Sequence, residues 1–370
     1  MQILLVVCKL EKGLEDEKEP KKMDKIDGNS NPCIFTFIKR MFTNKKTKSR
    51  KTRYILFHYF SIYKNERGIL SGVLPYKRSL INGRLNSLPT RLDTNRFELG
   101  LIELAKAEFD PADYVFQEGQ VLKDIEWLSQ EDSLYSVAEH DYLKEDGSYG
   151  GIVIGLSLSP KYYLRDDKGK ILRDPKTNMA MFKVYTDDQL KDKAKKISND
   201  IISRIRKTLP NPPIIVGVMK LQQNNGNLPG NFILKGKISA GQSSADWKDM
   251  NESYLFLPAN TTGIKDQYGD FILGFNRFKD EMDRFLPGFA GVTGLARIVD
   301  GNLVELTVHV NAEFDSTVEV IQFTQFAISM SNESFPKEAQ LNLYINTIDE
   351  PKAIYVRQAN GDDFMHIYRE

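Results

Sequence analysis

The densest group of ionisable residues in this chain is the tripeptide Glu139-His140-Asp141. A histidine next to an orienting carboxylate is the arrangement that a general base requires, provided that both side chains point toward one place. Apolar residues around the tripeptide predict a helix, and neighbouring residues of a helix face different directions. We therefore interpret the tripeptide as part of a surface helix. The apolar positions of that helix are Leu134, Val137, Ala138 and Tyr142, and Asp146-Gly147 closes it.

Three other polar positions could contact a ligand. Gln117 and Glu118 belong to the polar stretch Gln117-Glu118-Gly119-Gln120, which could line a pocket or form a turn that ends an extended segment. Trp247 lies in a predicted polar loop, residues 239–252, and could stack on a ligand or plug an edge of the core. The candidate ligand-binding residues are Trp247, Gln117 and Glu118.

No residue pattern indicates a catalytic class, a metal or a cofactor. The four histidines, His58, His140, His309 and His366, lack the short spacing of a metal motif. The three glycines of residues 288–294 follow a helix and enter a strand, which reverses the order of a phosphate-binding loop. We therefore predict no catalytic residue, no metal and no cofactor, although a carboxylate pair assembled from distant residues would leave a cryptic hydrolase open.

The elements that must position these residues are clearest between Asp187 and Ile238. Apolar residues at helical spacing predict a helix that Leu209-Pro210 stops, and residues 214–219 and 232–238 then read as two strands around a turn. The same order of elements returns in residues 270–310, where a helix ends at Leu286-Pro287 and two strands follow. Matching units indicate a duplicated module, so we predict that residues 187–238 and 270–310 superpose.

The remaining chain predicts further helices and strands. Helices are expected after Asp93-Thr94-Asn95 and around residues 318–328, with a hairpin turn at residues 166–169. Strands are expected at residues 114–116, 151–158, 254–257, 341–345 and 353–356. The predicted fold class is α+β, with two tandem related repeats, each an antiparallel sheet covered by helices. We assign residues 1–63 to a largely disordered signal and tether region, 64–240 to the first repeat and 241–370 to the second.

Composition excludes some classes of partner. A hydrophobic content of 41% and a charged content of 27% fit a folded soluble body, and a net charge of +1 argues against a nucleic-acid binder. The two cysteines, Cys8 and Cys33, both precede the predicted folded body, so no disulfide between them staples its core. We expect a monomer that binds no nucleic acid.

The N-terminal region has the outline of a membrane anchor. Residues 1–7 are apolar and lead into Cys8, as at the end of a lipoprotein signal, but no basic segment precedes them and Val7 is bulky. A buried strand or an unstructured start is the alternative interpretation. Because the apolar run is short, we expect poor export of the chain as it stands.

A charged segment separates Cys8 from the predicted body. Eight basic residues fall in residues 39–53, which either form a solvated tether or are attracted to an anionic surface. Residues 54–63 are apolar but too short to span a bilayer, so they predict a strand or an interfacial anchor. Low-hydrophobicity tethers bury little surface, so deletion of residues 9–60 is expected to leave the melting temperature nearly unchanged.

Short stretches with a distinctive sequence recur along the predicted body. They are Val73-Leu74-Pro75-Tyr76-Lys77, Thr90-Arg91-Leu92-Asp93, Phe97-Glu98-Leu99-Gly100-Leu101, Phe116-Gln117-Glu118-Gly119-Gln120, Glu139-His140-Asp141-Tyr142-Leu143, Gly155-Leu156-Ser157-Leu158, Pro229-Gly230-Asn231-Phe232 and Phe323-Thr324-Gln325. Together they resemble, over residues 73–357, the CamS family of sex-pheromone lipoproteins of Gram-positive bacteria. The resemblance implies export, a lipid on Cys8, attachment to the extracellular face of the cell membrane, and two related repeats. It also implies that the signal segment is processed to a short hydrophobic pheromone peptide.

Three functions therefore compete. The first is a non-enzymatic, membrane-anchored extracytoplasmic lipoprotein that is the precursor of a pheromone peptide. The second is a module that binds a peptide or a cell-wall glycan near Trp247. The third is the cryptic hydrolase. A deep pocket with convergent carboxylates would favour an enzyme, and a shallow aromatic groove would favour binding.

Overall fold

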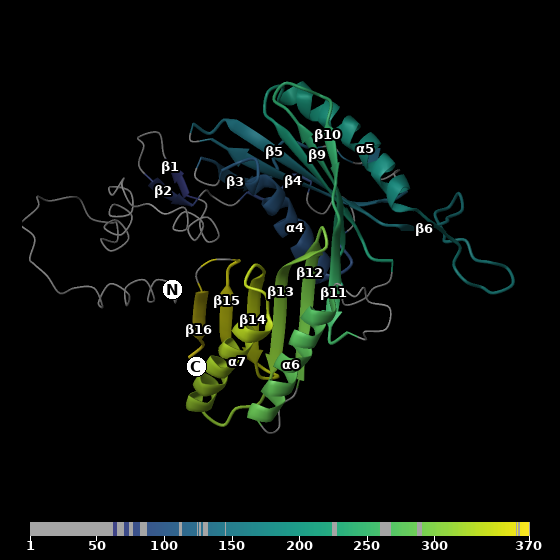
Figure 1. Ribbon diagram of the computed structural model, residues 1–370. Helices are drawn as coiled ribbons and strands as arrows, with labels where there is room; N and C mark the ends of the chain where they lie inside the picture. The colour runs from purple at the N-terminus through teal and green to yellow at the C-terminus, as the bar shows by residue number, and fades with distance from the viewer. Residues whose placement is uncertain are drawn as a thin grey trace, which may run out of the picture. The chain divides into compact units, whose positions relative to one another are not determined.

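The computed structural model describes most of the chain from residue 62 onward (Figure 1). The described residues are 62–64, 70–73, 77–81, 87–110, 113–123, 125, 127–128, 132–144, 146–223, 228–259, 268–286, 291–359, 361 and 363–369. Cys8, the basic run and most of the apolar stretch 54–63 lie outside them. All described elements belong to the unit Ile62–Glu370.

Two six-stranded sheets contain most of the strands. The first sheet is made of β3 (Val115–Glu118), β4 (Leu134–Leu143), β5 (Tyr149–Leu158), β8 (Ile214–Lys220), β9 (Asn231–Ile238) and β10 (Asp246–Asp249). The second is made of β11 (Glu252–Leu257), β12 (Gly291–Val299), β13 (Asn302–Asn311), β14 (Gln340–Asn346), β15 (Pro351–Arg357) and β16 (Asp363–Ile367). Two smaller ladders pair β1 (Ile62–Lys64) with β2 (Leu70–Val73) and β6 (Lys161–Tyr163) with β7 (Phe182–Val184).

The two large sheets share one topology. The strand orders are β10-β9-β8-β5-β4-β3 and β11-β12-β13-β14-β15-β16. In each sheet three consecutive antiparallel strands lead into a helix, α5 (Asp187–Thr208) or α7 (Thr317–Ser334), which crosses over to a parallel strand. Three strands then continue outward as antiparallel neighbours. The predicted fold class, an α+β body of two tandem related repeats, is confirmed, with one parallel pair in each sheet.

The correspondence between the repeats differs from the predicted one. Helix α5 corresponds to α7, because both connect the parallel strands at the centre of a sheet. Helix α6 (Gly269–Phe285), which was matched to α5, instead connects the antiparallel strands β11 and β12. The superposition of residues 187–238 on 270–310 is therefore wrong in its connectivity. Both helices end at Leu-Pro, but this local signal does not encode which strand the chain has left.

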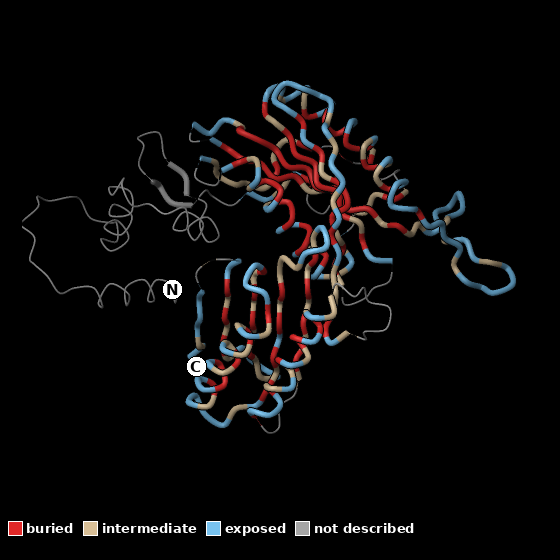
Figure 2. The backbone as a smooth tube through the Cα atoms, viewed as in Figure 1, coloured by how far each residue is buried: buried red, intermediate tan, exposed pale blue. Residues whose placement is uncertain are grey.

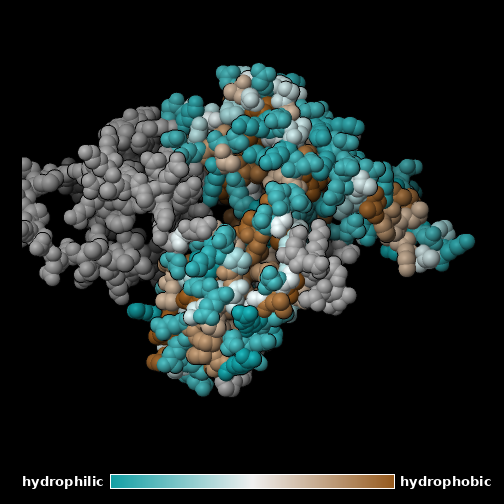
Figure 3. All heavy atoms as spheres, in the orientation of Figure 1, coloured by the Kyte–Doolittle hydropathy of each residue, from teal (hydrophilic) through white to brown (hydrophobic). Residues whose placement is uncertain are grey.

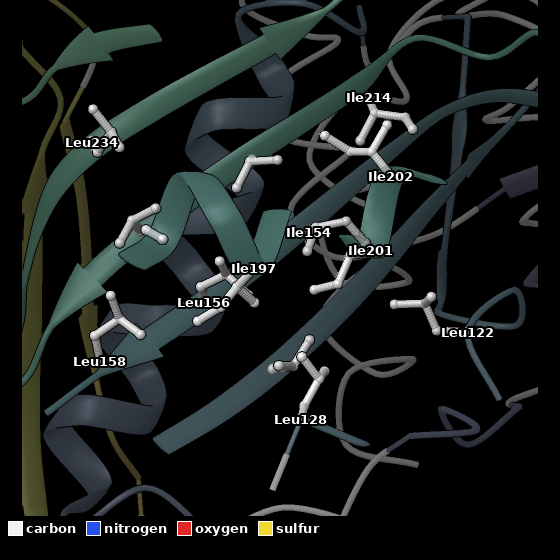
Figure 4. Close-up of a cluster of buried hydrophobic side chains, with 14 of the residues drawn as sticks. Leu122, Leu128, Ile154, Leu156, Leu158, Ile197, Ile201, Ile202, Ile214 and Leu234 are labelled. Carbon is white, nitrogen blue, oxygen red and sulfur yellow. The ribbon is translucent and has the colours of Figure 1, made fainter. Parts of the chain in front are cut away.

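Helices cover both faces of the first sheet. Helix α4 (Arg91–Lys106) packs Phe97, Leu101 and Leu104 on one face, and α5 packs its isoleucines on the other. Figure 4 shows Ile197 and Ile201 of α5 beside Leu156 and Ile154 of β5 in this first core. Strands covered on both faces read as continuous apolar runs, which explains the sequence Ile-Ile-Val-Gly-Val-Met of β8.

Of the helices that the structure describes, those that pack on the second sheet cover only one of its faces. Helices α6 and α7 pack together on the face that Leu306, Leu341 and Tyr355 line. Buried and half-buried residues alternate along β12, β14 and β15, as they do in a sheet with one uncovered face (Figure 2). Cross-strand partners on this uncovered face form rows of aromatic, amide, hydroxyl and aliphatic side chains: Thr293, His309, Tyr344 and Ile354 in one row, and Leu295, Thr307, Asn342 and Val356 in the next.

Two local predictions are wrong. The predicted surface helix around residues 134–142 is strand β4, which is buried on both faces and therefore lacks the alternation that identifies a strand. The predicted polar loop 239–252 contains strand β10, whose side chains are mostly exposed at a sheet edge. Strand β10 pairs with β9 of the first sheet, although the predicted division at residue 240 assigned it to the second repeat.

Candidate functional site

Strand pairing brings together the two polar stretches that the sequence analysis treated separately. Gln117 of β3 lies opposite Asp141 of β4, and Glu118 lies opposite His140. Because residues two apart in a strand point to the same face, Glu139 and Asp141 both point to the face that α5 covers. The intervening His140 points to the other face. The result is a pair of carboxyl groups on one strand, next to the loop that follows β3.

Backbone amides of that loop hold the carboxyl pair. The two Glu139 carboxylate oxygens accept hydrogen bonds from the amides of Val121 and Leu122, each at 2.8 Å. Asp141 Oδ2 accepts from the amide of Gln120, also at 2.8 Å. The loop passes so close that a Cβ atom at Gly119 would lie 2.4 Å from the Glu139 side chain. Three consecutive amides and a required glycine therefore fix the loop over β4.

Burial raises the pKa of both carboxyl groups of this pair. Burial, followed by the nearby charge of Glu139, raises the pKa of Asp141 to about 9. Burial also raises the pKa of Glu139 above its ordinary value, but two amide hydrogen bonds favour its ionised form. At neutral pH Asp141 is therefore protonated.

The carboxyl pair is placed to hold the loop and not to meet a substrate. Glu139 is 2% exposed and Asp141 is fully buried. His140 cannot act as their partner base, because it lies on the opposite face with its ring 5.0 Å from that of Phe116. Burial lowers the pKa of His140 to about 4, so its ring is neutral at physiological pH. The arrangement required by the hydrolase hypothesis, two carboxyl groups side by side, exists here but is closed to solvent.

The predicted ligand-binding residues do not converge. Gln117 and Glu118 point to opposite faces of β3, and Glu118 Oε2 accepts a hydrogen bond from the amide of Ser79 at 2.7 Å. Trp247 lies on β10, where its ring covers Gly236 so closely that a Cβ atom there would approach it to 2.6 Å. The Trp247 ring is half-buried against the first core. A ligand role for these three residues stays a prediction.

An ionic cluster that the sequence did not indicate joins the two sheets. Its centre is Glu252 at the start of β11, whose side chain is fully buried. Glu252 Oε1 lies 2.8 Å from Arg96 Nη2 of α4 and 2.5 Å from Arg297 Nε of β12. Glu252 Oε2 accepts from the amide of Phe232 in β9 at 2.7 Å. Glu103 of α4 extends the cluster, with Arg297 Nη2 at 2.8 Å. Its partners are distant in sequence, so no local motif could have predicted the cluster.

Two further observations concern metals and membranes. Within the described residues, His, Cys, Asp and Glu side chains form no group of three that could hold a metal ion. None of the described helices combines the length and the apolar character needed to cross a bilayer.

Comparison with known proteins identifies a family profile and two solved structures that are similar to this chain. The family profile described as CamS sex pheromone cAM373 precursor matches residues 76–133 and 126–363. A sex pheromone precursor from Lactobacillus salivarius subsp. salivarius UCC118 shares the fold, with a TM-score of 0.68 and 22% identity over 82% of this chain and 95% of that chain. The C-terminal domain of sex pheromone staph-cAM373 precursor from Staphylococcus aureus also shares the fold, with a TM-score of 0.65. The sequence identity is 20%, over 77% of this chain and 99% of that chain. A comparison with curated proteins gives no match.

Proposed function

Because the chain belongs to the family of CamS sex pheromone cAM373 precursors, we propose that it is an extracytoplasmic lipoprotein and the precursor of a sex-pheromone peptide. The peptide derives from the segment before Cys8, and the Cys8 thiol carries the lipid that attaches the protein to the outer face of the cell membrane. The observation that carries this proposal is the family match along the folded body, residues 76–363.

A non-enzymatic role for the folded body is the second part of the proposal. The densest ionisable cluster of the sequence is the natural place to look for catalysis. Its two carboxyl groups are buried, and backbone amides of one loop donate hydrogen bonds to both Glu139 oxygens and to Asp141 Oδ2. Its histidine is neutral and points to the opposite side of the strand. This geometry supports a structural role for the cluster.

Labelled fatty acid fed to cells that express the gene from its own locus tests the anchor. We expect label in the wild-type protein and in the Cys33→Ala variant, and none in the Cys8→Ala variant. Because Cys33 is the only other cysteine of the chain, it is the matched control. Label that persists in Cys8→Ala, or that is absent from the wild type, would contradict lipidation at Cys8.

The pheromone part has its own test. Cell-free medium from the wild-type strain is expected to induce a conjugation response in recipient cells, and medium from a strain that lacks the gene is not. Equal responses to wild-type and gene-deletion media would contradict the proposal.

A second candidate function, a ligand- or wall-binding module, is favoured by the uncovered face of the second sheet. The rings of His309 and Tyr344 stack there at 4.9 Å between centroids and 12° between planes. Asn342 and Thr307 supply hydrogen-bonding groups in the adjacent row. Retention of the purified protein on isolated cell walls tests this candidate: Tyr344→Ala is expected to weaken it, and Trp247→Ala is not. If Trp247→Ala weakened retention and Tyr344→Ala did not, the wall contact would lie at Trp247, as the sequence indicated.

A further inference from the structure

A projecting arm leaves the first sheet between β5 and α5 (Figure 1). The arm is residues 161–184. Strands β6 and β7 form its base, where the amide of Tyr185 donates to the carbonyl of Pro160 at 2.8 Å. Beyond them, backbone hydrogen bonds join Leu164, Leu172 and Met181 to one another. The arm therefore has its own ladder of backbone hydrogen bonds.

Two turns give the arm a defined shape without a core. Asp166 Oδ1 accepts hydrogen bonds from the amides of Lys168 and Lys170, at 3.0 and 2.8 Å. Asp174 Oδ1 accepts from the amides of Lys176 and Thr177, at 2.9 and 2.8 Å. Such turns fix the backbone by local contacts alone. The side chains of the arm pack into no core of their own, although Arg165 and Arg173 each donate a hydrogen bond to a backbone carbonyl of the arm, at 2.7 and 2.8 Å.

Apolar side chains concentrate on the arm to an extent that needs an explanation. Of the eighteen exposed large hydrophobic residues among those that the structure describes, six lie in these 24 positions: Tyr163, Leu172, Met179, Met181, Phe182 and Val184. Met179 is the most exposed of the six, at 70%. Figure 3 shows hydrophobic residues gathered on this projection. Clustered exposed apolar residues mark a site of contact with a protein or a membrane.

The charge of the arm favours a membrane over a protein as its partner. Residues 161–184 contain seven basic and three acidic side chains, a net charge of +4, whereas the whole chain carries +1. Among the described residues, no carboxylate lies within ion-pair distance of an arm lysine or arginine. At the base, Lys161 Nζ instead lies 4.1 Å from the centroid of the Phe182 ring. Unpaired basic groups beside exposed apolar side chains complement an anionic lipid surface.

We propose that the arm binds the surface of a bilayer rich in anionic phospholipid headgroups. The inference rests on the proposed function, because a body tethered at Cys8 is held close to that surface. The apolar side chains enter the boundary between headgroups and acyl chains, and the basic side chains contact the phosphates. The arm is then a second, non-covalent contact that orients the body relative to the membrane.

A fluorescent label on the arm tests this contact in the full-length chain. Cys8 and Cys33 are replaced by serine, and an environment-sensitive dye is attached at Met179→Cys or at the control position Ile348→Cys, which is 84% exposed in the turn between β14 and β15. Vesicles of phosphatidylcholine alone are compared with vesicles containing about one third phosphatidylglycerol. We expect a blue shift at position 179 with the anionic vesicles only, and no shift at position 348.

The charge contribution is tested by Lys168→Gln, Lys170→Gln and Lys176→Gln in the chain labelled at position 179. Each basic residue that reaches an anionic surface strengthens binding about fivefold, so the triple variant is expected to bind on the order of 100-fold more weakly. The three side chains are exposed, so the melting temperature of the variant should equal that of the parent. Unchanged binding would overturn the assignment of the basic side chains.

Other results would overturn the proposal in distinct ways. Cosedimentation with vesicles without a shift at position 179 would place the contact elsewhere, with the basic run 39–53 the first candidate. A dye shift that depends on protein concentration in the absence of vesicles would identify a second copy of the chain as the partner of the arm. No binding to either kind of vesicle would show that the membrane is not its partner. Because the chain tested lacks Cys8, this assay can fail while fatty-acid labelling succeeds, and the two proposals are judged separately.

Discussion

The two large sheets of this protein have the same strand order but different surroundings. Helices α4 and α5 cover both faces of the first sheet, whereas α6 and α7 lie together on one face of the second. The crossover helices α5 and α7 are equivalent, so the difference comes from the other helix of each repeat. Helix α4 precedes its sheet and packs on the face opposite α5, and α6 is inserted between the first two strands of its sheet.

This difference shows that topology alone does not decide which surface a repeat exposes. The same strand order yields central strands buried on both faces in one repeat and a sheet with an uncovered face in the other. Stability is therefore concentrated in the first sheet, where both faces exclude water. The second sheet keeps one surface available. The following predictions test that division, from the largest expected effect to the smallest.

Phe232→Ala in β9 should have the largest effect. Its fully buried ring packs between α4 and the first sheet, with Phe97 at 6.5 Å between centroids. Its loss should lower the free energy of unfolding by about 3–5 kcal/mol. Val356→Ala in β15, the equivalent strand of the second sheet, is the control and should cost about 1 kcal/mol, since its side chain is only half-buried on the uncovered face. Equal losses in denaturant titrations would contradict the comparison.

Glu252→Ala tests whether the two sheets unfold together. Removal of the carboxylate leaves the buried Arg96 and the half-buried Arg297 with only more exposed carboxylates such as Glu103 as partners, which should cost about 3 kcal/mol. Calorimetry should then show the unfolding of the two sheets separated into two transitions. The control Glu350→Ala, which removes a partly exposed partner of Lys352, should change the free energy of unfolding by less than about 0.5 kcal/mol. One transition at an unchanged temperature would show that the cluster does not couple the sheets.

Asp141→Asn tests the charge buried within the first sheet. The pKa of Asp141 is raised to about 9 in the folded protein, above its unfolded value, so folded molecules hold a proton that unfolded ones release. Stability from this group is therefore fully present below about pH 4 and is lost as the pH rises toward 9. Asn cannot ionise, so the variant should be more stable than wild type by about 1–2 kcal/mol at pH 8.

Melting temperatures measured from pH 5 to pH 9 check this prediction. The wild-type curve should fall more steeply with pH than that of Asp141→Asn. Asp283→Asn, at an exposed position on α6 of the second repeat, is the control and should follow the wild-type curve. Parallel curves for wild type and Asp141→Asn would show that the buried pair does not hold the proton.

His309→Ala should have the smallest effect. The ring lies on the uncovered face of the second sheet, stacked on Tyr344. Surface substitutions of this kind change the free energy of unfolding by about 0.5 kcal/mol or less. A loss comparable to that of Phe232→Ala in the isolated protein would show that this face is covered, and the contrast between the sheets would fail.

Much of the local structure could be read from sequence because its signals are local. The helical spacing of α5 and α6, the stop at Leu-Pro and the turn at Asp300-Gly301 all depend on residues within one or two turns of each other. Strands β8 and β13 were both expected as strands, and the structure shows that the continuous apolar run of β8 is buried on both faces whereas β13 is only partly buried. Strand β4 was mistaken for a helix, since burial on both faces removed its alternation.

The sites were less predictable, because they depend on which strands become neighbours. The sequence identified the Gln117–Gln120 and Glu139–Asp141 stretches as polar and dense in ionisable groups, but only the pairing of β3 with β4 joined them. The Glu252 cluster draws on four elements and has no local motif at all.

The sequence by itself determined the family, the fold class and most element types, because these follow from short-range pattern and composition. Only the tertiary structure decided that Asp141 keeps its proton, that α5 corresponds to α7, and that a basic, apolar arm stands clear of the core. The physical reason is the same in each case. Burial, strand neighbours and exposure are properties of residues far apart in the chain, and they exist only once the chain has folded.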